Sequence, residues 1–137
     1  LAIDQMDRLR RMLRGSGISY GMWVGSTPDK DAGADVERAP ESLSGEPLAK
    51  WLDDPKAKTR RVPQEERISE EDIRTRPPRL LLTNPQQMEL LLTRAKDQGL
   101  FSSGQLRYLV QLRQFSTNAA YAFLNFLQIL GNAINQR

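Results

Sequence analysis

The stretch RLLLTNPQQMELLLTR, residues 79–94, decides the fold of this chain. Residues 80–82 form a short, continuous apolar run, which is typical of a strand that is buried on both faces. Asn84 is suited to cap a following helix, and Pro85 fits the first helical position, where a missing N–H costs nothing. The stretch therefore predicts a buried strand that passes directly into a helix.

The helix predicted after this strand has one apolar face, formed by Met88, Leu91, Leu92 and Ala95. In open α/β sheets, ligands bind at the edge where the strands end and the helices begin. Thr83 and Asn84 fall at that edge, where a hydroxyl, an amide and the N–H groups of a helix N-terminus suit a phosphate. The alternative is that both residues only cap the helix.

Upstream, residues 1–14 are predicted to form a helix, because Met6, Leu9 and Leu13 recur on one stripe. Its arginines form either a solvated face or a face that contacts phosphates. Alternating apolar residues predict a strand over residues 18–24, followed by a turn over residues 25–28. The arginines of this helix are Arg8, Arg10, Arg11 and Arg14.

Residues 29–76 have a different composition, rich in charged residues, proline and glycine and poor in apolar ones. Such a segment buries little surface, so we expect a long, charged and largely irregular insertion. Two short helices are predicted inside it, over residues 47–53 and 69–75. The second begins with Ser69 and three carboxylates, a typical helix N-terminus.

After the central helix, a loop is predicted over residues 97–104 and a strand over residues 106–112. Residues 114–136 carry no charge, and their apolar residues recur at helical spacing. We expect an apolar helix there, either in the core or exposed. In the second case Phe123, Phe126 and Leu130 would face another copy of the chain or a different partner.

Composition excludes several kinds of site. The 137 residues include no cysteine and no histidine, so disulfides, thiol chemistry and histidine-dependent catalysis are excluded within this sequence. The net charge of +3 permits nucleic-acid binding but does not argue for it. The apolar residues near the C-terminus are too few, and too mixed with asparagine and glutamine, to cross a membrane.

Three segments resemble one family. Residues 80–94 resemble the segment of DEAD/DEAH-box superfamily 2 helicases that carries motif Ib, in the form found in the large bacterial Lhr-like type. LAIDQ, residues 1–5, with Arg8 and Leu9 resembles the end of motif Ia. GQLRYLV, residues 104–110, resembles the strand that leads into motif II.

This resemblance implies an α/β fold: a partial RecA-like lobe with a parallel three-stranded sheet and flanking helices over residues 1–113, interrupted by the charged insertion at residues 29–78. Residues 114–137 would be a separate apolar helix of uncertain origin. The implied partners are nucleic acid, DNA rather than RNA, and the rest of a cytoplasmic helicase. The residues implied to contact the nucleic-acid backbone are Gln5, Arg8, Thr83 and Asn84, with Arg11 and Arg94 as further electrostatic candidates.

The chain departs from the family at two motifs. No Asp-Glu pair follows Val110, and no Walker-type phosphate loop is present. The family uses ATP and Mg²⁺, but this sequence is expected to hold neither and to be inactive alone as an ATPase. We therefore expect a fragment of a helicase. The alternative is an interaction or oligomerisation module that uses its apolar C-terminal helix and has no enzymatic activity.

Overall fold

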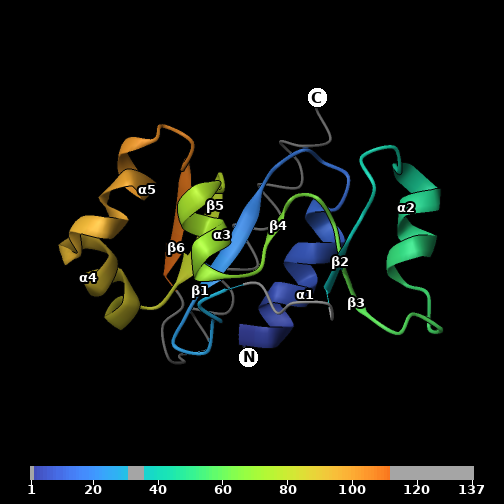
Figure 1. Cartoon of the computed structure of the whole chain (residues 1–137), viewed down its shortest axis with the longest axis horizontal. Coiled ribbons are helices and arrows are strands. Elements are labelled where there is room, and N and C mark those ends of the chain that lie inside the picture. Colours follow the sequence, from blue (N-terminus) through green and yellow to red (C-terminus); the bar gives the residue numbers. More distant parts are fainter. Residues whose placement is uncertain (1, 31–35, 112–137) are drawn as a thin grey trace.

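The computed structural model describes residues 2–30 and 36–111, with the backbone alone for residues 2–5 and 111. It contains both helices and strands, mixed along the chain (Figure 1). They are α1 (Ala2–Leu13), β1 (Tyr20–Trp23), β2 (Val36–Arg38), α2 (Gly45–Leu52), β3 (Arg60–Val62), β4 (Glu66–Arg67), α3 (Glu70–Thr75), β5 (Leu80–Thr83), α4 (Pro85–Thr93), η2 (Ala95–Asp97), α5 (Gln98–Ser102) and β6 (Tyr108–Gln111).

The main sheet has four parallel strands in the order β4-β1-β5-β6. The strand predicted at residues 80–82 is confirmed as β5, a central strand whose four residues are all buried. The strands predicted at residues 18–24 and 106–112 are confirmed as β1 and β6, each shorter than predicted. The prediction of three strands was wrong, because Glu66 and Arg67 of the insertion form a fourth strand beside β1.

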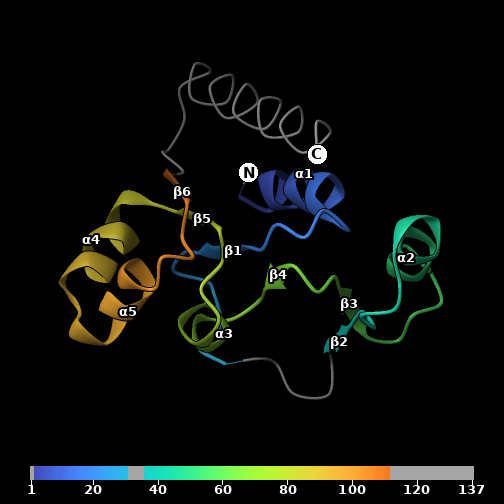
Figure 2. The ribbon, with the colours of Figure 1, turned by 90° about the horizontal axis from the view of Figure 1, so that it is seen from above.

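The helix α1 covers one face of this sheet (Figure 2). Its residues Met6, Leu9 and Leu13 are buried against Tyr20 of β1 and Leu80 of β5. This is the stripe that the sequence pattern predicted. Burial of this kind contributes roughly 1.5–3 kcal/mol for each large apolar side chain, so it fixes α1 firmly against β1 and β5.

The opposite face is covered by α3, α4 and α5 (Figure 2). Ile73 of α3, Leu91 of α4 and Leu100 of α5 pack with Trp23 and Leu81, which point to this side of the sheet. Strands covered on both faces explain the continuous apolar run of β5, because neither face of that strand meets water.

The insertion is more ordered than its composition predicts. It contains a two-stranded parallel sheet of β2 and β3 as well as α2, and Leu48 and Val62 are buried within it. Arg38 of β2 reaches the main sheet region, donating to the carbonyl of Glu66 at 2.6 Å and to the carboxylate of Asp72 at 3.2 Å. The helices predicted at residues 47–53 and 69–75 are confirmed as α2 and α3. Arginine–carboxylate pairs hold the segment against the main sheet with few apolar residues.

Two details of the region after β5 also differ from prediction. In the predicted apolar face of α4, Leu91 is buried, but Leu92 is 52% exposed and Ala95 lies beyond the helix, in η2. The predicted loop at residues 97–104 contains a short helix, α5. The apolar helix predicted at residues 114–137, including Phe123, Phe126 and Leu130, lies outside the described residues.

Candidate functional site

The carboxyl edge of the sheet brings two loops together. β1 and β5 run parallel with Trp23 opposite Thr83, so both strands end at the same level. A Cβ built on Gly25, in the turn after β1, would lie 3.9 Å from the side-chain nitrogen of Gln87 in α4. In Figure 1 the N-terminal end of α1 lies at this same lower edge of the molecule. Two chain segments, the loops after β1 and β5, therefore meet where parallel sheets commonly bind ligands.

The turn after β1 is held by its own hydrogen bonds. The hydroxyl of Thr27 accepts a hydrogen bond from the N–H of Val24 and donates one to the carbonyl of Met22, both at 2.9 Å. Ser26, at the tip of the turn, is exposed. The hydrogen bonds of Thr27 thus hold the turn in one conformation, in which the side chain of Ser26 faces solvent.

The N-terminus of α4 is capped as the sequence predicts. The side-chain oxygen of Asn84 accepts a hydrogen bond from the N–H of Gln87 at 2.9 Å, and Pro85 stands at the start of the helix. Within the described part of the chain, no partner is recorded for the N–H of Gln86, whose side chain is exposed. The helix dipole places positive partial charge at this end, so an anion is favoured there.

Thr83 occupies a different position from the one predicted for a phosphate contact. Its side chain is fully buried, and its hydroxyl donates a hydrogen bond to the backbone carbonyl of Trp23 at 2.7 Å. A buried hydroxyl that already donates has no surface to offer a phosphate oxygen. The prediction of a direct Thr83 contact is therefore wrong for this structure, and Thr83 instead ties the ends of β1 and β5 together.

The other predicted contact residues lie on α1 and after the last residue of α4. Arg8 is exposed in the first two turns of α1, and the backbone of Gln5 lies one turn before it, whereas the side chain of Gln5 is not described. Arg11 is exposed farther along α1. Arg94 follows the last residue of α4, roughly 13 Å along the helix from its N-terminus. Asn84 therefore stands at the edge, and within the described part of the chain no recorded contact brings Arg8, Arg11 or Arg94 to the loops after β1 and β5.

A buried ion pair that the sequence did not reveal fixes α1 over the edge strand β4. Arg10 donates to the carboxylate of Glu66 at 2.6 and 2.9 Å, and Glu66 is only 1% exposed. Burial lowers the pKa of Arg10, but its hydrogen bonds to Glu66 and the charge of that carboxylate outweigh burial and raise the pKa overall. Arg10 is therefore engaged inside the protein and does not contribute a free charge to the surface.

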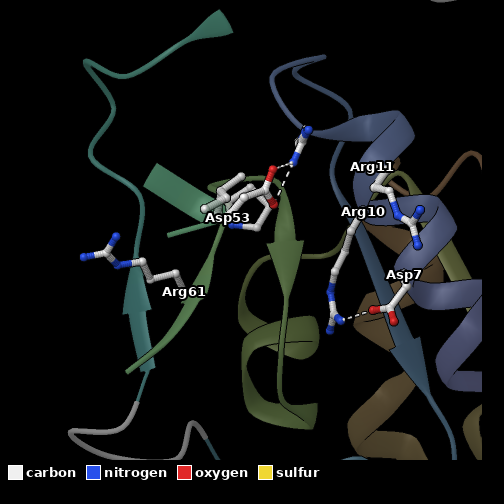
Figure 3. A pocket seen from close by; sticks show the side chains of 8 residues that line it. Asp7, Arg10, Arg11, Asp53 and Arg61 are labelled. Carbon is white, nitrogen blue, oxygen red and sulfur yellow. Dashed lines mark hydrogen bonds and ion pairs between the residues drawn. The ribbon is translucent and has the colours of Figure 1, made fainter. Parts of the chain in front are cut away.

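A cavity of about 190 Å³ lies between α1 and the insertion (Figure 3). Arginines predominate in its lining, accompanied by two carboxylates. Figure 3 shows Arg10 and Arg11 projecting from α1, Asp53 reaching toward that helix, and Arg61 turned away from it. The lining residues are Asp7, Arg10, Arg11, Arg14, Leu52, Asp53, Arg61 and Pro63.

Two of the loops at the carboxyl edge lack carboxylates. Residues 24–28 and 84–87, which follow β1 and β5, include no carboxylate to hold Mg²⁺. Among the described residues, no group of three or more acidic side chains is arranged to bind a metal ion. None of the described helices has the length and apolar character needed to cross a membrane.

The donors described at this edge are the exposed N-terminus of α4 and the turn at residues 25–28. The acidic start of α3 lies beside that turn, because the N–H groups of Glu70 and Glu71 donate to the carbonyls of Pro28 and Asp29 at 2.9 and 3.0 Å. The chain was compared with protein-family models, with curated proteins and with solved structures, and none of these matches it.

Proposed function

We propose that this chain is part of a RecA-like lobe of an ATP-dependent nucleic-acid helicase and that it binds the sugar–phosphate backbone of a nucleic-acid strand. The observation that carries the proposal is the meeting of two loops at the carboxyl edge of a parallel sheet. One loop is the turn at residues 25–28, and the other is the capped N-terminus of α4. Asn84, at the start of α4, is a position at which the resemblance to motif Ib implies a contact, whereas the turn at residues 25–28 is an addition to the positions that the resemblance implies.

The chemistry of this edge suits phosphate oxygens. Arg8 offers charged donors, Ser26 a hydroxyl, and Gln86 a backbone N–H at the positive end of a helix dipole. Donors of this kind bind the backbone of any sequence, since base recognition requires contacts to base edges. The proposal is therefore binding that is sensitive to salt and tolerant of sequence.

In this proposal, ATP is bound and hydrolysed by other parts of the helicase. The family hydrolyses ATP with a Walker-type loop and an Asp-Glu motif, and this sequence contains neither. In this proposal the chain contributes positioning of one strand, DNA rather than RNA, and the remainder of a cytoplasmic helicase contributes hydrolysis.

The test is the affinity of the whole chain for a fluorescent single-stranded oligothymidylate at low and moderate salt. Arg8→Gln removes a proposed contact, and Gln86→Glu places a negative charge at the N-terminus of α4, where it also suits the helix dipole and so preserves the fold. Each has a charge-matched control at an exposed residue near the opposite edge of the sheet: Arg107→Gln and Gln105→Glu.

We expect both test variants to bind about three- to tenfold more weakly than their controls at low salt, because each loses or opposes one phosphate contact. We also expect the affinity of the unmodified chain to fall as salt rises. Equal affinities for test and control variants, or no binding by the unmodified chain at low salt, would refute the proposal.

A further inference from the structure

The cavity between α1 and the insertion contains two arginines with unequal partners. Arg11 has no recorded carboxylate partner within the described residues, whereas Arg14 is paired with Asp53. The two stand three positions apart on the α1 segment, so their side chains are neighbours, and both line the cavity. Two guanidinium groups that line one cavity can both donate to one phosphate group.

Asp53 holds only part of Arg14. One terminal nitrogen of Arg14 lies 3.1 and 3.3 Å from the two carboxylate oxygens of Asp53. No hydrogen bond is recorded for the other two guanidinium nitrogens of Arg14 within the described residues. The side chain of Asp53 is 67% exposed, at the end of α2, so water competes for the same carboxylate. An exposed pair of this kind contributes little to stability and exchanges readily.

The remaining charges of the cavity are already neutralised by partners inside the protein. Arg10 is held by Glu66 and by Asp7, at 2.6 and 2.8 Å. Arg61 pairs with Asp54 at 3.2 Å and lies over the ring of Trp51, turned away from α1 in Figure 3. Arg11 and Arg14 are therefore the cationic groups of the cavity that an incoming anion can engage.

We infer that Arg11 and Arg14 form a second phosphate site for a nucleic-acid strand, and that Asp53 occupies this site as an internal competitor. A phosphate group displaces the carboxylate from Arg14 and gains the donors of Arg11 as well. The inference rests on the proposed function, since it extends the strand's path from the carboxyl edge along α1. It differs from the proposal in assigning an inhibitory role to the insertion.

The first test measures oligothymidylate affinity for Asp53→Asn against Glu46→Gln. Both substitutions remove one negative charge from α2 or its end, but Glu46 is exposed and has no recorded ion pair among the described residues. We expect Asp53→Asn to bind about three- to fivefold more tightly than Glu46→Gln, the range of an exposed ion pair. We also expect a plot of log affinity against log salt concentration to be steeper for Asp53→Asn by about 0.7. This change in slope corresponds to one further phosphate contact on a single strand.

The gain should depend on both arginines. In the Asp53→Asn background, Arg11→Gln or Arg14→Gln should return the affinity to that of Glu46→Gln. Lys96→Gln in the same background removes an equal charge from an exposed lysine in η2, beyond the C-terminal end of α4, and should keep most of the gain. Equal losses from all three substitutions would refute a specific site.

A second readout separates this inference from the proposed function. Inorganic phosphate is added to the Asp53→Asn chain, and the side-chain Nε–Hε signals of its arginines are followed by NMR. We expect the signals of Arg11 and Arg14 to shift, and to shift less in the unmodified chain. Absence of any phosphate-dependent shift at both residues would refute the site, whatever the oligonucleotide does. Failure of every variant to bind oligonucleotide would instead refute the proposed function.

Discussion

The hydroxyl of Thr83 donates a hydrogen bond to the backbone carbonyl of Trp23 at 2.7 Å, across 60 residues of sequence. The bond joins the last residues of two adjacent parallel strands, and the two loops of the candidate site leave the sheet immediately after them. Thr83 thus acts on the site by holding its two loops together, and its buried side chain makes no surface contact.

Thr83→Val tests this structural role. Valine keeps the shape of threonine but leaves the carbonyl of Trp23 without its donor, so the free energy of unfolding should fall by about 1–2 kcal/mol. Thr93→Val is the control, because Thr93 is exposed and its hydroxyl donates only within α4. That control should change stability by less than about 0.5 kcal/mol.

At a temperature where both threonine variants remain folded, oligonucleotide affinity should stay within about twofold of the unmodified chain. The measurements are urea unfolding followed by circular dichroism and fluorescence anisotropy of a labelled oligothymidylate. A large loss of binding by Thr83→Val without loss of stability would show that the hydroxyl reaches the nucleic acid after all.

Glu66→Gln tests the buried pair that fixes α1. Glu66 is 1% exposed, and the substitution removes the buried negative charge that faces Arg10. The guanidinium of Arg10 is still partly hydrated, because its side chain is 31% exposed. We expect the free energy of unfolding to fall by about 2–3 kcal/mol, somewhat below the range for fully buried pairs. Glu37→Gln breaks a half-exposed pair with Arg61 and should cost less than about 1 kcal/mol. Similar costs for both variants in urea unfolding would show that the Arg10–Glu66 pair is not the stronger anchor.

Tyr20 gives the protein a predicted sensitivity to alkaline pH. Burial, and after it the negative charge of Glu66, raises the pKa of Tyr20 above its ordinary value. Because the folded state then binds the phenolic proton more tightly than the unfolded state, this stability is present below about pH 10 and is lost as pH rises above it.

Tyr20→Phe removes this titration together with a buried hydroxyl that lies beside the carboxylate of Glu66. We expect the variant to lie within about 1 kcal/mol of the unmodified chain at pH 7. The stability of the variant relative to the unmodified chain should increase between pH 10 and pH 11. Urea unfolding at these three pH values measures it, and a difference that stays constant or shrinks with pH would contradict the account.

The chain is expected to release no phosphate from ATP. Residues 24–28 and 84–87 offer no carboxylate for Mg²⁺, and the sequence contains no Walker-type loop. A sensitive phosphate assay with Mg²⁺ and single-stranded DNA should match the rate of buffer alone. Hydrolysis that copurifies with the chain and is altered by substitution of its residues would overturn this prediction.

The sequence predicted the elements whose signals are local. The apolar run at residues 80–82, the cap at Asn84 and the stripe of α1 each appear where their patterns indicated. The position of β5 between two other strands is also consistent with that run, since a strand covered on both faces needs no alternation of polar residues.

The sequence did not predict the features that depend on distant pairing. The order of the insertion depends on arginine–carboxylate contacts such as Arg38 with Asp72 and Arg10 with Glu66, which are 34 and 56 residues apart. Charged residues at such separations look the same in a sequence whether they pair or remain in water. The burial of Thr83 was missed for a related reason, since its acceptor is a backbone carbonyl on another strand.

The central claim is that a nucleic-acid strand lies across the loops at the carboxyl edge of the sheet. Its most direct test is an NMR titration of the isotope-labelled chain with a single-stranded oligothymidylate at low salt, following backbone amide signals. The account predicts the largest shifts at residues 25–28 and 86–88 and near Arg8, with small shifts at residues 103–107 near the opposite edge. Shifts that are uniform over the surface, or concentrated at residues 103–107 while residues 25–28 and 86–88 stay unchanged, would contradict it.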